Sequence, residues 1–241
     1  MKSWKAVSLI TLVVLIIFAV RVFFIWRERH EAMIAPPKAA EPQLTQDQMV
    51  LPRKMYIHDL DDAKALAGKP VWIQAGYSLD YYPYADHHVD FAHKSGVLPG
   101  TLRLDIKNIV TEKVPSSLAS RMPHGDKQAF AVFTVPSDPK QYATAIGFLQ
   151  GSDWTFYCDD IFYYDDPHTV YSFWGPKVWE AIDAHHPIVG MNELQTAMAL
   201  GVIQQSESSD IGNRAVIYQV GPQKWSVTFR NDKATTIRQE N

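Results

Sequence analysis

An apolar run near the amino terminus constrains this chain more than any other feature. Residues 6–20 contain no charged side chain, and apart from one arginine the apolar character continues to Trp26. At a rise of about 1.5 Å per residue, a helix over residues 6–26 is long enough to cross a hydrocarbon layer of about 30 Å. Trp4 and Trp26 stand at its two ends, where interfacial aromatic residues are common. We therefore expect a transmembrane anchor at residues 6–26, preceded by a short flank at residues 1–5.

The apolar run is expected to remain as a signal anchor rather than to be removed as a signal peptide. Signal peptides have an apolar core of about 7–15 residues, followed by small residues at the cleavage site. Here the run ends in Phe, Ile, Trp and Arg instead. Lys and Arg flank both ends, so the positive-inside rule gives a divided answer and the opposite orientation stays open. The short basic start and the long following domain favour a single-pass protein of the bacterial inner membrane, with its C-terminal region in the periplasm.

The composition is that of a chain with a folded core. Of the 241 residues, 46% are apolar and 12% are aromatic. The formal net charge is -3 and no block of like charges occurs, which gives no electrostatic basis for nucleic-acid binding. Cys158 is the only cysteine, so no internal disulfide forms and the core alone must hold the fold. We expect Cys158 to be a small buried residue, with a reactive thiol as the alternative.

Residues 27–54 are expected to form a flexible linker, and residues 55–171 a β-rich domain. The linker contains several prolines and no periodic apolar face. Alternation of apolar and polar residues over 102–110 predicts a half-buried strand, and residues 128–135, apolar on both faces, predict a central strand. Further strands are expected at residues 71–73, 142–149, 154–158 and 161–164, and a short helix at residues 61–67.

Residues 172–241 are expected to form a small α-α-β-β-β domain. Pro176 stands where a first helix begins, and Asn192 is placed to cap a second helix that ends at Gly201. Strands follow at residues 215–220, 225–229 and 234–237. Together with the β-rich domain, these elements predict an α+β fold with mostly antiparallel sheets.

Most of this last domain, about residues 172–238, resembles the BamE-like (SmpA/OmlA) domain. The family pattern of Gly-Met, a short amphipathic helix, Leu-Gly and a β-meander is matched at Gly190-Met191, Leu200-Gly201 and Trp225–Phe229. The resemblance implies an envelope module that acts through contacts with other proteins. The chain departs from the family in three ways: an expected transmembrane helix in place of a lipidated cysteine, an additional β-rich region, and no Pro after Leu200-Gly201.

A group of histidines and aspartates in the β-rich domain is a candidate metal site. Imidazole and carboxylate groups are metal ligands. The residues concerned are His87, His88, Asp90 and His93. Their spacing matches no named metal-binding motif, and a polar loop between strands is the alternative interpretation.

A second, more acidic group lies near the end of the same domain. It consists of Asp159, Asp160, Asp165, Asp166 and His168. Its carboxylates suit Ca²⁺, which prefers several oxygen ligands. They also suit a general acid and base, with Asp160 and Asp165 as the candidate pair. The EF-hand spacing is absent, and Asp166-Pro167 is also an ordinary turn signal.

Standard catalytic motifs are missing from the sequence, among them the nucleophile elbow, the zinc-protease motif, the P-loop and the paired-cysteine redox motif. We therefore expect a membrane-anchored extracytoplasmic protein that acts as a non-enzymatic protein-interaction module in the cell envelope. Its expected partner is another envelope protein, and no cofactor is expected. Two alternatives stay open: an envelope protein that binds a divalent metal or a small ligand, and a carboxylate-dependent hydrolase.

Overall fold

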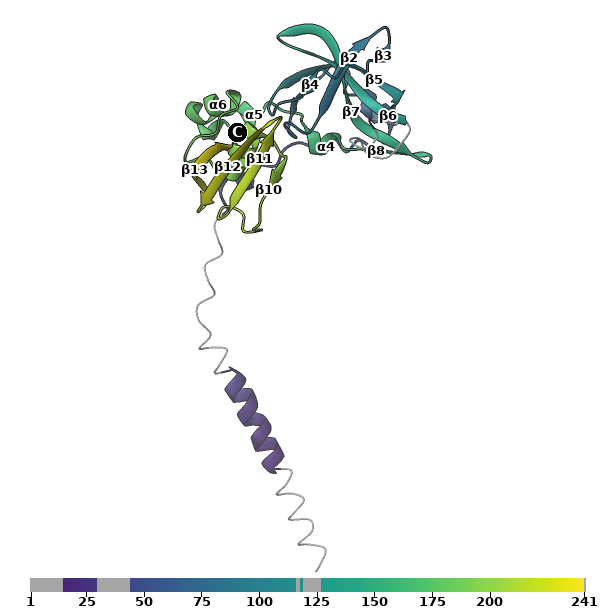
Figure 1. Ribbon diagram of the computed structural model, residues 1–241. Coiled ribbons are helices and arrows are strands. Elements are labelled where there is room, and N and C mark those ends of the chain that lie inside the picture. Colours follow the sequence, from purple (N-terminus) through teal and green to yellow (C-terminus); the bar gives the residue numbers. More distant parts are fainter. Residues whose placement is uncertain (1–14, 30–43, 116–117, 119–126, 241) are drawn as a thin grey trace, which may run out of the picture. The chain divides into compact units, whose positions relative to one another are not determined.

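The computed structural model of the chain describes residues 15–29, 44–115, 118 and 127–240 (Figure 1). It falls into two compact units, Met1–Thr45 and Gln46–Asn241. In the first unit, residues 15–29 are helical, whereas residues 6–14 of the expected anchor lie outside the described residues. No helix within the described residues has both the length and the hydropathy needed to cross a membrane. The anchor at residues 6–26 therefore stays a prediction.

The second unit contains two antiparallel sheets, which confirms an α+β fold. Within the described residues the larger sheet has nine strands, with the main order β3-β2-β7-β6-β5-β1-β9 and with β4 on β2 and β8 on β7. Its strands are β1 (Pro70–Ile73), β2 (Asp80–Ala85), β3 (His88–Val89), β4 (Gly96–Val97), β5 (Arg103–Lys113), β6 (Lys127–Val135), β7 (Asp138–Gln150), β8 (Asp153–Phe156) and β9 (Phe162–Tyr163).

The central strand β6 explains why this sheet carries a core on each face. Residues Gln128 to Phe133 are all buried, as the apolar character of both faces predicted. Successive side chains of a strand point to opposite faces. Ala131 and Phe133 accordingly belong to one core, and Phe130 and Val132 to another.

Short helices replace part of the expected strand structure around the larger sheet. The helix expected at residues 61–67 is α3 (Leu60–Lys64), which Asp59 caps by accepting hydrogen bonds from two backbone N–H groups of its first turn. The strand expected at residues 161–164 is wrong in part, because α4 (Cys158–Ile161) occupies its start. Burial of Cys158 is confirmed, and this burial raises the pKa of its thiol to about 12.

The C-terminal elements are α5 (Pro167–Val170), the 3₁₀ helix η1 (Ser172–Trp174), α6 (Pro176–Asp183), α7 (Glu193–Leu200), β10 (Gln204–Gln205), β11 (Ala215–Val220), β12 (Gln223–Arg230) and β13 (Lys233–Glu240). The two helices and three strands expected at residues 172–241 occur in the expected order as α6, α7, β11, β12 and β13, and η1 and the short strand β10 are additional. The smaller sheet has the order β10-β11-β12-β13. Its buried side chains, such as Tyr218 and Phe229, share one core with Trp179 of α6 and Met198 of α7. Asn192 forms a complete capping box with Gln195 at the start of α7.

Three glycines allow the loops that follow β1 and β4 to pack, backbone against backbone, on each other and on the C-terminal end of α7. A Cβ atom on Gly76 would lie 2.6 Å from the Gly100 nitrogen, and one on Gly100 would lie 2.5 Å from the Met198 carbonyl oxygen. A Cβ atom on Gly201, just after α7, would lie 2.5 Å from the Gly76 oxygen. The Val202 N–H also donates to the Gly76 carbonyl at 3.1 Å. Only residues without a side chain fit this contact.

Residues 46–57, here called the docked segment, run over both cores and differ from the expected linker. The segment begins with α2 (Gln46–Met49), where Asp47 accepts hydrogen bonds from the Trp174 indole N–H and from the Asn192 amide. It ends at Ile57, which is buried in the core of the larger sheet. Residues 46–54, expected to be part of a flexible linker, thus belong to the compact unit. Isolated polar side chains such as Asp47 and Arg53 bind them to the rest of the unit. Isolated contacts of this kind produce no periodic pattern in a sequence, so they could not be predicted.

Candidate functional site

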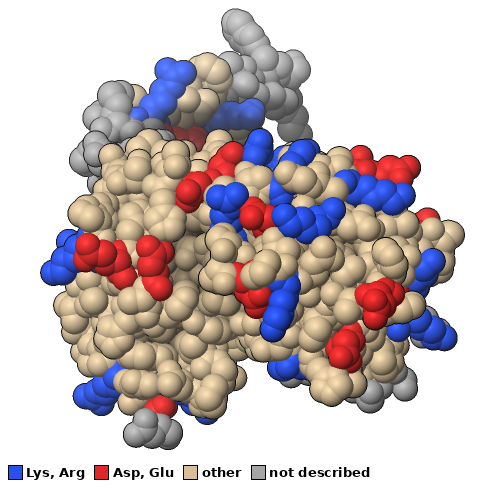
Figure 2. All heavy atoms as spheres, turned by 90° about the horizontal axis from the view of Figure 1, so that it is seen from above, with Lys and Arg blue, Asp and Glu red and all other residues tan. Residues whose placement is uncertain are grey.

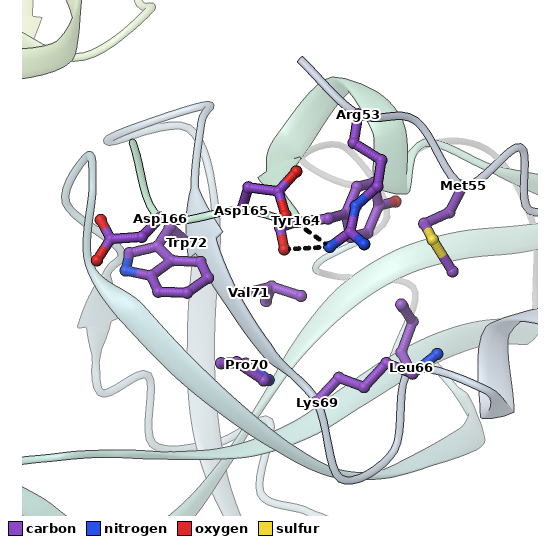
Figure 3. Close-up of a pocket in the computed structure, with 10 residues that line it drawn as sticks. All are labelled: Arg53, Met55, Leu66, Lys69, Pro70, Val71, Trp72, Tyr164, Asp165 and Asp166. Carbon is purple, nitrogen blue, oxygen red and sulfur yellow. Dashed lines mark hydrogen bonds and ion pairs between the residues drawn. The ribbon is translucent and has the colours of Figure 1, made fainter. Parts of the chain in front are cut away.

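A groove of about 330 Å³ lies where the docked segment, β1 and the chain after β9 come together (Figure 3). Trp72 and Asp166 stand at one end of it, and Met55 and Leu66 at the other. Val71 lies between the two ends. The full lining is Arg53, Met55, Leu66, Lys69, Pro70, Val71, Trp72, Tyr164, Asp165 and Asp166.

The groove exists because β1 and β9 pair over a short distance and then separate. β1 pairs with β5 along Pro70–Trp72, but with β9 only at Trp72 and Ile73. No strand in the described part of the chain pairs with Pro70 or Val71 on the β9 side. Beyond β9, Asp166 caps α5 and Pro167 opens it, which turns the chain away from β1. The strand start and the turn together leave the gap that Arg53 enters.

Arg53 forms the polar wall of the groove. One guanidinium nitrogen, Nη2, lies 3.0 Å from the Asp165 carboxylate and donates to the Tyr164 carbonyl at 2.6 Å (Figure 3). The Lys69 ammonium group, by contrast, forms no ion pair or hydrogen bond with any described residue, and Lys69 is exposed. The carboxylates of the groove are therefore engaged, and its unpaired charge is positive.

Asp166 links the groove to an imidazole between two carboxylates. His168 Nδ1 lies 3.0 Å from Asp166 Oδ1, and its Nε2 lies 3.1 Å from Asp183 Oδ1. The imidazole stacks on the Trp179 ring with a centroid distance of 4.1 Å. Partial burial lowers the pKa of His168, but the hydrogen bonds with Asp183 and Asp166 outweigh it, so the pKa lies above its ordinary value.

A second hollow, of about 210 Å³, lies beside the glycine contact at the end of α7. Arg103, Asp183 and His185 line it together with residues 99–102. The Arg103 guanidinium lies 6.0 Å from the Trp72 ring centroid, so this cation and ring connect the second hollow with the groove. Thr101 and His185 both adopt left-handed backbone conformations, with φ of 59° and 51°. For residues with a side chain, such conformations cost about 1–3 kcal/mol and tend to cluster at functional sites.

The first predicted metal site is spread over a hairpin and the loop after it. His87 occupies the β2–β3 turn with φ of 65°, and His88 Nδ1 in β3 lies 3.5 Å from Glu112. Asp90 and His93 contact each other at 2.8 Å, and this hydrogen bond is the main cause that lowers the pKa of Asp90. The structure thus pairs Asp90 with His93 but gives His87 and His88 other surroundings.

The carboxylates of the second predicted site have separate partners. Asp159 accepts hydrogen bonds from the Met55 and Tyr56 N–H groups, each at 2.9 Å, and from the Tyr164 hydroxyl at 2.7 Å. Burial raises the pKa of Asp159, but these three bonds together bring it below its ordinary value. Asp160 is exposed on α4 and does not line the groove, whereas Asp165 does. The candidate acid–base pair is therefore not brought together in the groove.

The two predicted sites are also remote in the strand order. β3, which carries His88, and β9, which lies between Asp160 and Asp165, stand at opposite ends of the larger sheet's main order. Among the described residues, no group of three or more His, Cys, Asp or Glu side chains is arranged to hold a metal ion. Metal binding at either predicted site stays a prediction that the arrangement of the described side chains does not support.

Sequence reasoning did not find the residues that build the groove. From sequence, Arg53 was assigned to the flexible linker. Lys69 was assigned only to the connection between a helix and a strand. Trp72 was recognised as part of a strand and not as a rim residue. Arg53 and the carbonyl it contacts are 111 positions apart, and no local pattern joins such positions. The one usable signal was Gly68 with Pro70, which marks a sharp strand start.

Charges of both signs are mixed on the visible surface. Figure 2 shows one face, on which Lys and Arg lie interspersed with Asp and Glu and wide uncharged areas separate them. No single sign dominates this face, in agreement with the net charge of -3. Comparison of the chain with known protein families, curated proteins and solved structures finds no match.

Proposed function

We propose that this protein is a membrane-anchored, extracytoplasmic module of the cell envelope that binds another protein and catalyses no reaction. The groove carries this proposal. It combines an apolar floor with a partly exposed tryptophan, an arginine and a methionine at its rim, which are residue types enriched in protein interfaces. Its one unpaired cation, Lys69, is exposed and available to a partner.

The place of the module in the envelope is supported by two sequence features. The apolar run at residues 6–26 suits a single-pass anchor, with the compact unit outside the inner membrane. The BamE-like resemblance of residues 172–238 suits a domain that acts through protein contacts. The capped helix α7 and the strands β11 to β13 stand where that resemblance expects a helix and a β-meander. Because a fold alone does not imply a function, the groove and not the fold is the main support.

The two alternative functions receive less support from the geometry. A general base or a metal ligand needs a carboxylate that is available to substrate or ion. Asp159, Asp165 and Asp166 are instead bound to backbone N–H groups, to Arg53 and to His168. These carboxylates hold the docked segment and α5 in place, which is a structural role.

Affinity capture of the full-length protein from detergent-solubilised membranes of its own host tests the proposal. We expect a C-terminally tagged chain to retain a defined envelope protein. A Lys69→Glu variant should retain less of it, because the substitution reverses the free charge of the groove. Lys177→Glu, on the exposed side of α6, makes the same charge change away from the groove and serves as the control. Repeated capture without any specific partner would count against an interaction module.

A further inference from the structure

We infer that the groove beside β1 binds an acidic peptide segment of the partner, with one apolar side chain on the groove floor and a neighbouring carboxylate at Lys69 and Arg53. This inference rests on the proposed function and names the chemistry of its partner. Three observations support it: the residues that line the groove, the pairing of its charged side chains, and the proline that begins β1.

The floor of the groove is apolar and suits one or two side chains. Leu66 and Val71 are fully buried beneath the groove, and the apolar surface that a ligand can reach comes from Met55, Pro70 and Trp72. A volume of about 330 Å³ is at the lower end of the range of about 300–1,000 Å³ for ligand pockets. Such a space takes the side chains of a short segment and not a whole helix. An apolar side chain placed there removes the exposed apolar surface of Met55, Pro70 and Trp72 from water.

The charges of the groove favour an anionic ligand. Asp165 is neutralised by Arg53, and Asp166 is bound to His168 and to the start of α5. Arg53 uses Nη2 for both of its contacts, and no hydrogen bond of its Nη1 or Nε with a described residue is found. These free donors and the Lys69 ammonium group suit a carboxylate. A cationic ligand would instead have to compete with Arg53 for Asp165.

The peptide is recognised through its side chains and not by strand addition. β1 begins with Pro70, which has no N–H group to donate to an incoming strand. Proline at such a position is a known means of blocking strand addition at an open edge. Without a continuous backbone ladder, affinity depends on the apolar side chain and the carboxylate. Binding should therefore depend on the peptide sequence.

A selection from a random seven-residue peptide display library tests the inference. The target is the full-length protein, immobilised in detergent. We expect the enriched peptides to carry an apolar residue next to Asp or Glu. Synthetic versions should bind Lys69→Glu at least about tenfold more weakly than the unmodified protein. Lys69→Gln, which removes the charge without reversing it, should give a smaller loss, and Lys177→Glu should give none.

Three results would overturn the acidic-peptide inference: no enrichment, enrichment of peptides without an acidic residue, or equal binding to the unmodified protein and to Lys69→Glu. Lys69 is exposed, so its substitution leaves the core intact, and circular dichroism checks this directly. The two proposals fail separately. A captured partner that ignores the Lys69 substitution would remove the groove inference but keep the interaction module. Peptide binding without any captured membrane partner would keep the groove inference but count against the interaction module.

Discussion

At the scale of single residues, the imidazole of His168 makes part of the stability depend on pH. Because the folded-state pKa of His168 is raised, its stabilising effect is fully present below the ordinary histidine pKa of about 6.5. The effect is lost as the pH rises through the higher, folded-state pKa. We therefore predict that His168→Gln lowers the melting temperature most near pH 5.5 and least near pH 9.

Thermal unfolding of both proteins over this pH range measures that difference. The partners of His168 are the carboxylates of Asp166 and Asp183, on α5 and α6, and the ring lies on Trp179. A difference in melting temperature that stays constant, or that grows towards alkaline pH, would show that the imidazole is not held as a cation between the carboxylates.

Asp159 holds the end of the docked segment in place through two backbone hydrogen bonds. Replacing Asp159 with Ala leaves two backbone N–H groups and the Tyr164 hydroxyl without their acceptor. We predict a loss of about 1–3 kcal/mol in the free energy of unfolding. Denaturant unfolding measures this loss, and the neighbouring Asp160→Ala is the matched control because Asp160 is exposed. Equal effects of the two substitutions would contradict the anchoring role.

The same carboxylate has a pH dependence of opposite sign. The folded-state pKa of Asp159 is lowered, so its stabilising effect is present above the ordinary aspartate pKa of about 3.9. The effect is lost as the pH falls through the lower, folded-state pKa. The stability difference between the unmodified protein and Asp159→Ala should therefore be full at neutral pH and should shrink under strongly acidic conditions.

At the scale of elements, the contact of the loops after β1 and β4 with the end of α7 depends on the absence of side chains. A Cβ atom on Gly100 would come within 2.5 Å of the Met198 carbonyl oxygen, which belongs to a helix backbone and cannot easily move. We predict that Gly100→Ala destabilises the protein by about 1–3 kcal/mol. Where the folded structure has room for the methyl group, replacing Gly with Ala stabilises a protein because it restricts the unfolded chain. The sign of the change in the free energy of unfolding, measured by denaturant unfolding, therefore shows whether the close contact exists. Unchanged or increased stability would contradict the close contact.

The elements that were predicted from sequence are those with a strong local pattern. β6 was predicted from apolar residues on both faces, and α7 from Asn192 before it and Gly201 after it. α4 was missed because it is only four residues long and no side-chain cap marks its start, so it shows neither a helical period nor a start signal. The secondary structure of residues 77–93 could not be assigned well from sequence, because left-handed Asp86 and His87 form the tight β2–β3 turn and the adjoining strands are short.

The groove could not be predicted from sequence because its parts meet only in the folded chain. Its floor comes from the turn after α3 and from β1, its wall from Arg53, and its far side from the residues after β9. Of the predicted site residues, Asp165 and Asp166 do line it, as partners of Arg53 and His168. The sequence thus placed Asp166 in one group with its partner His168, but it gave no sign that Arg53 is the partner of Asp165.

At the scale of the whole molecule, the proposed orientation predicts where the compact unit lies. With an anchor at residues 6–26 and the amino terminus inside, a C-terminal tag should resist protease in intact cells. The tag should become sensitive once the outer membrane is opened. Protease protection followed by detection of the tag measures this. A tag that stays protected until the inner membrane is broken would place the unit in the cytoplasm and remove the envelope context.

Site-specific photo-cross-linking in living cells tests most directly whether the groove is the binding surface of an interaction module. A photoreactive amino acid replaces Pro70, which is exposed in the groove, or Lys177, which is exposed on α6 outside it. We predict that light produces a defined adduct with another envelope protein from position 70 and none from position 177. No adduct from position 70, or the same set of adducts from both positions, would contradict a partner bound in the groove.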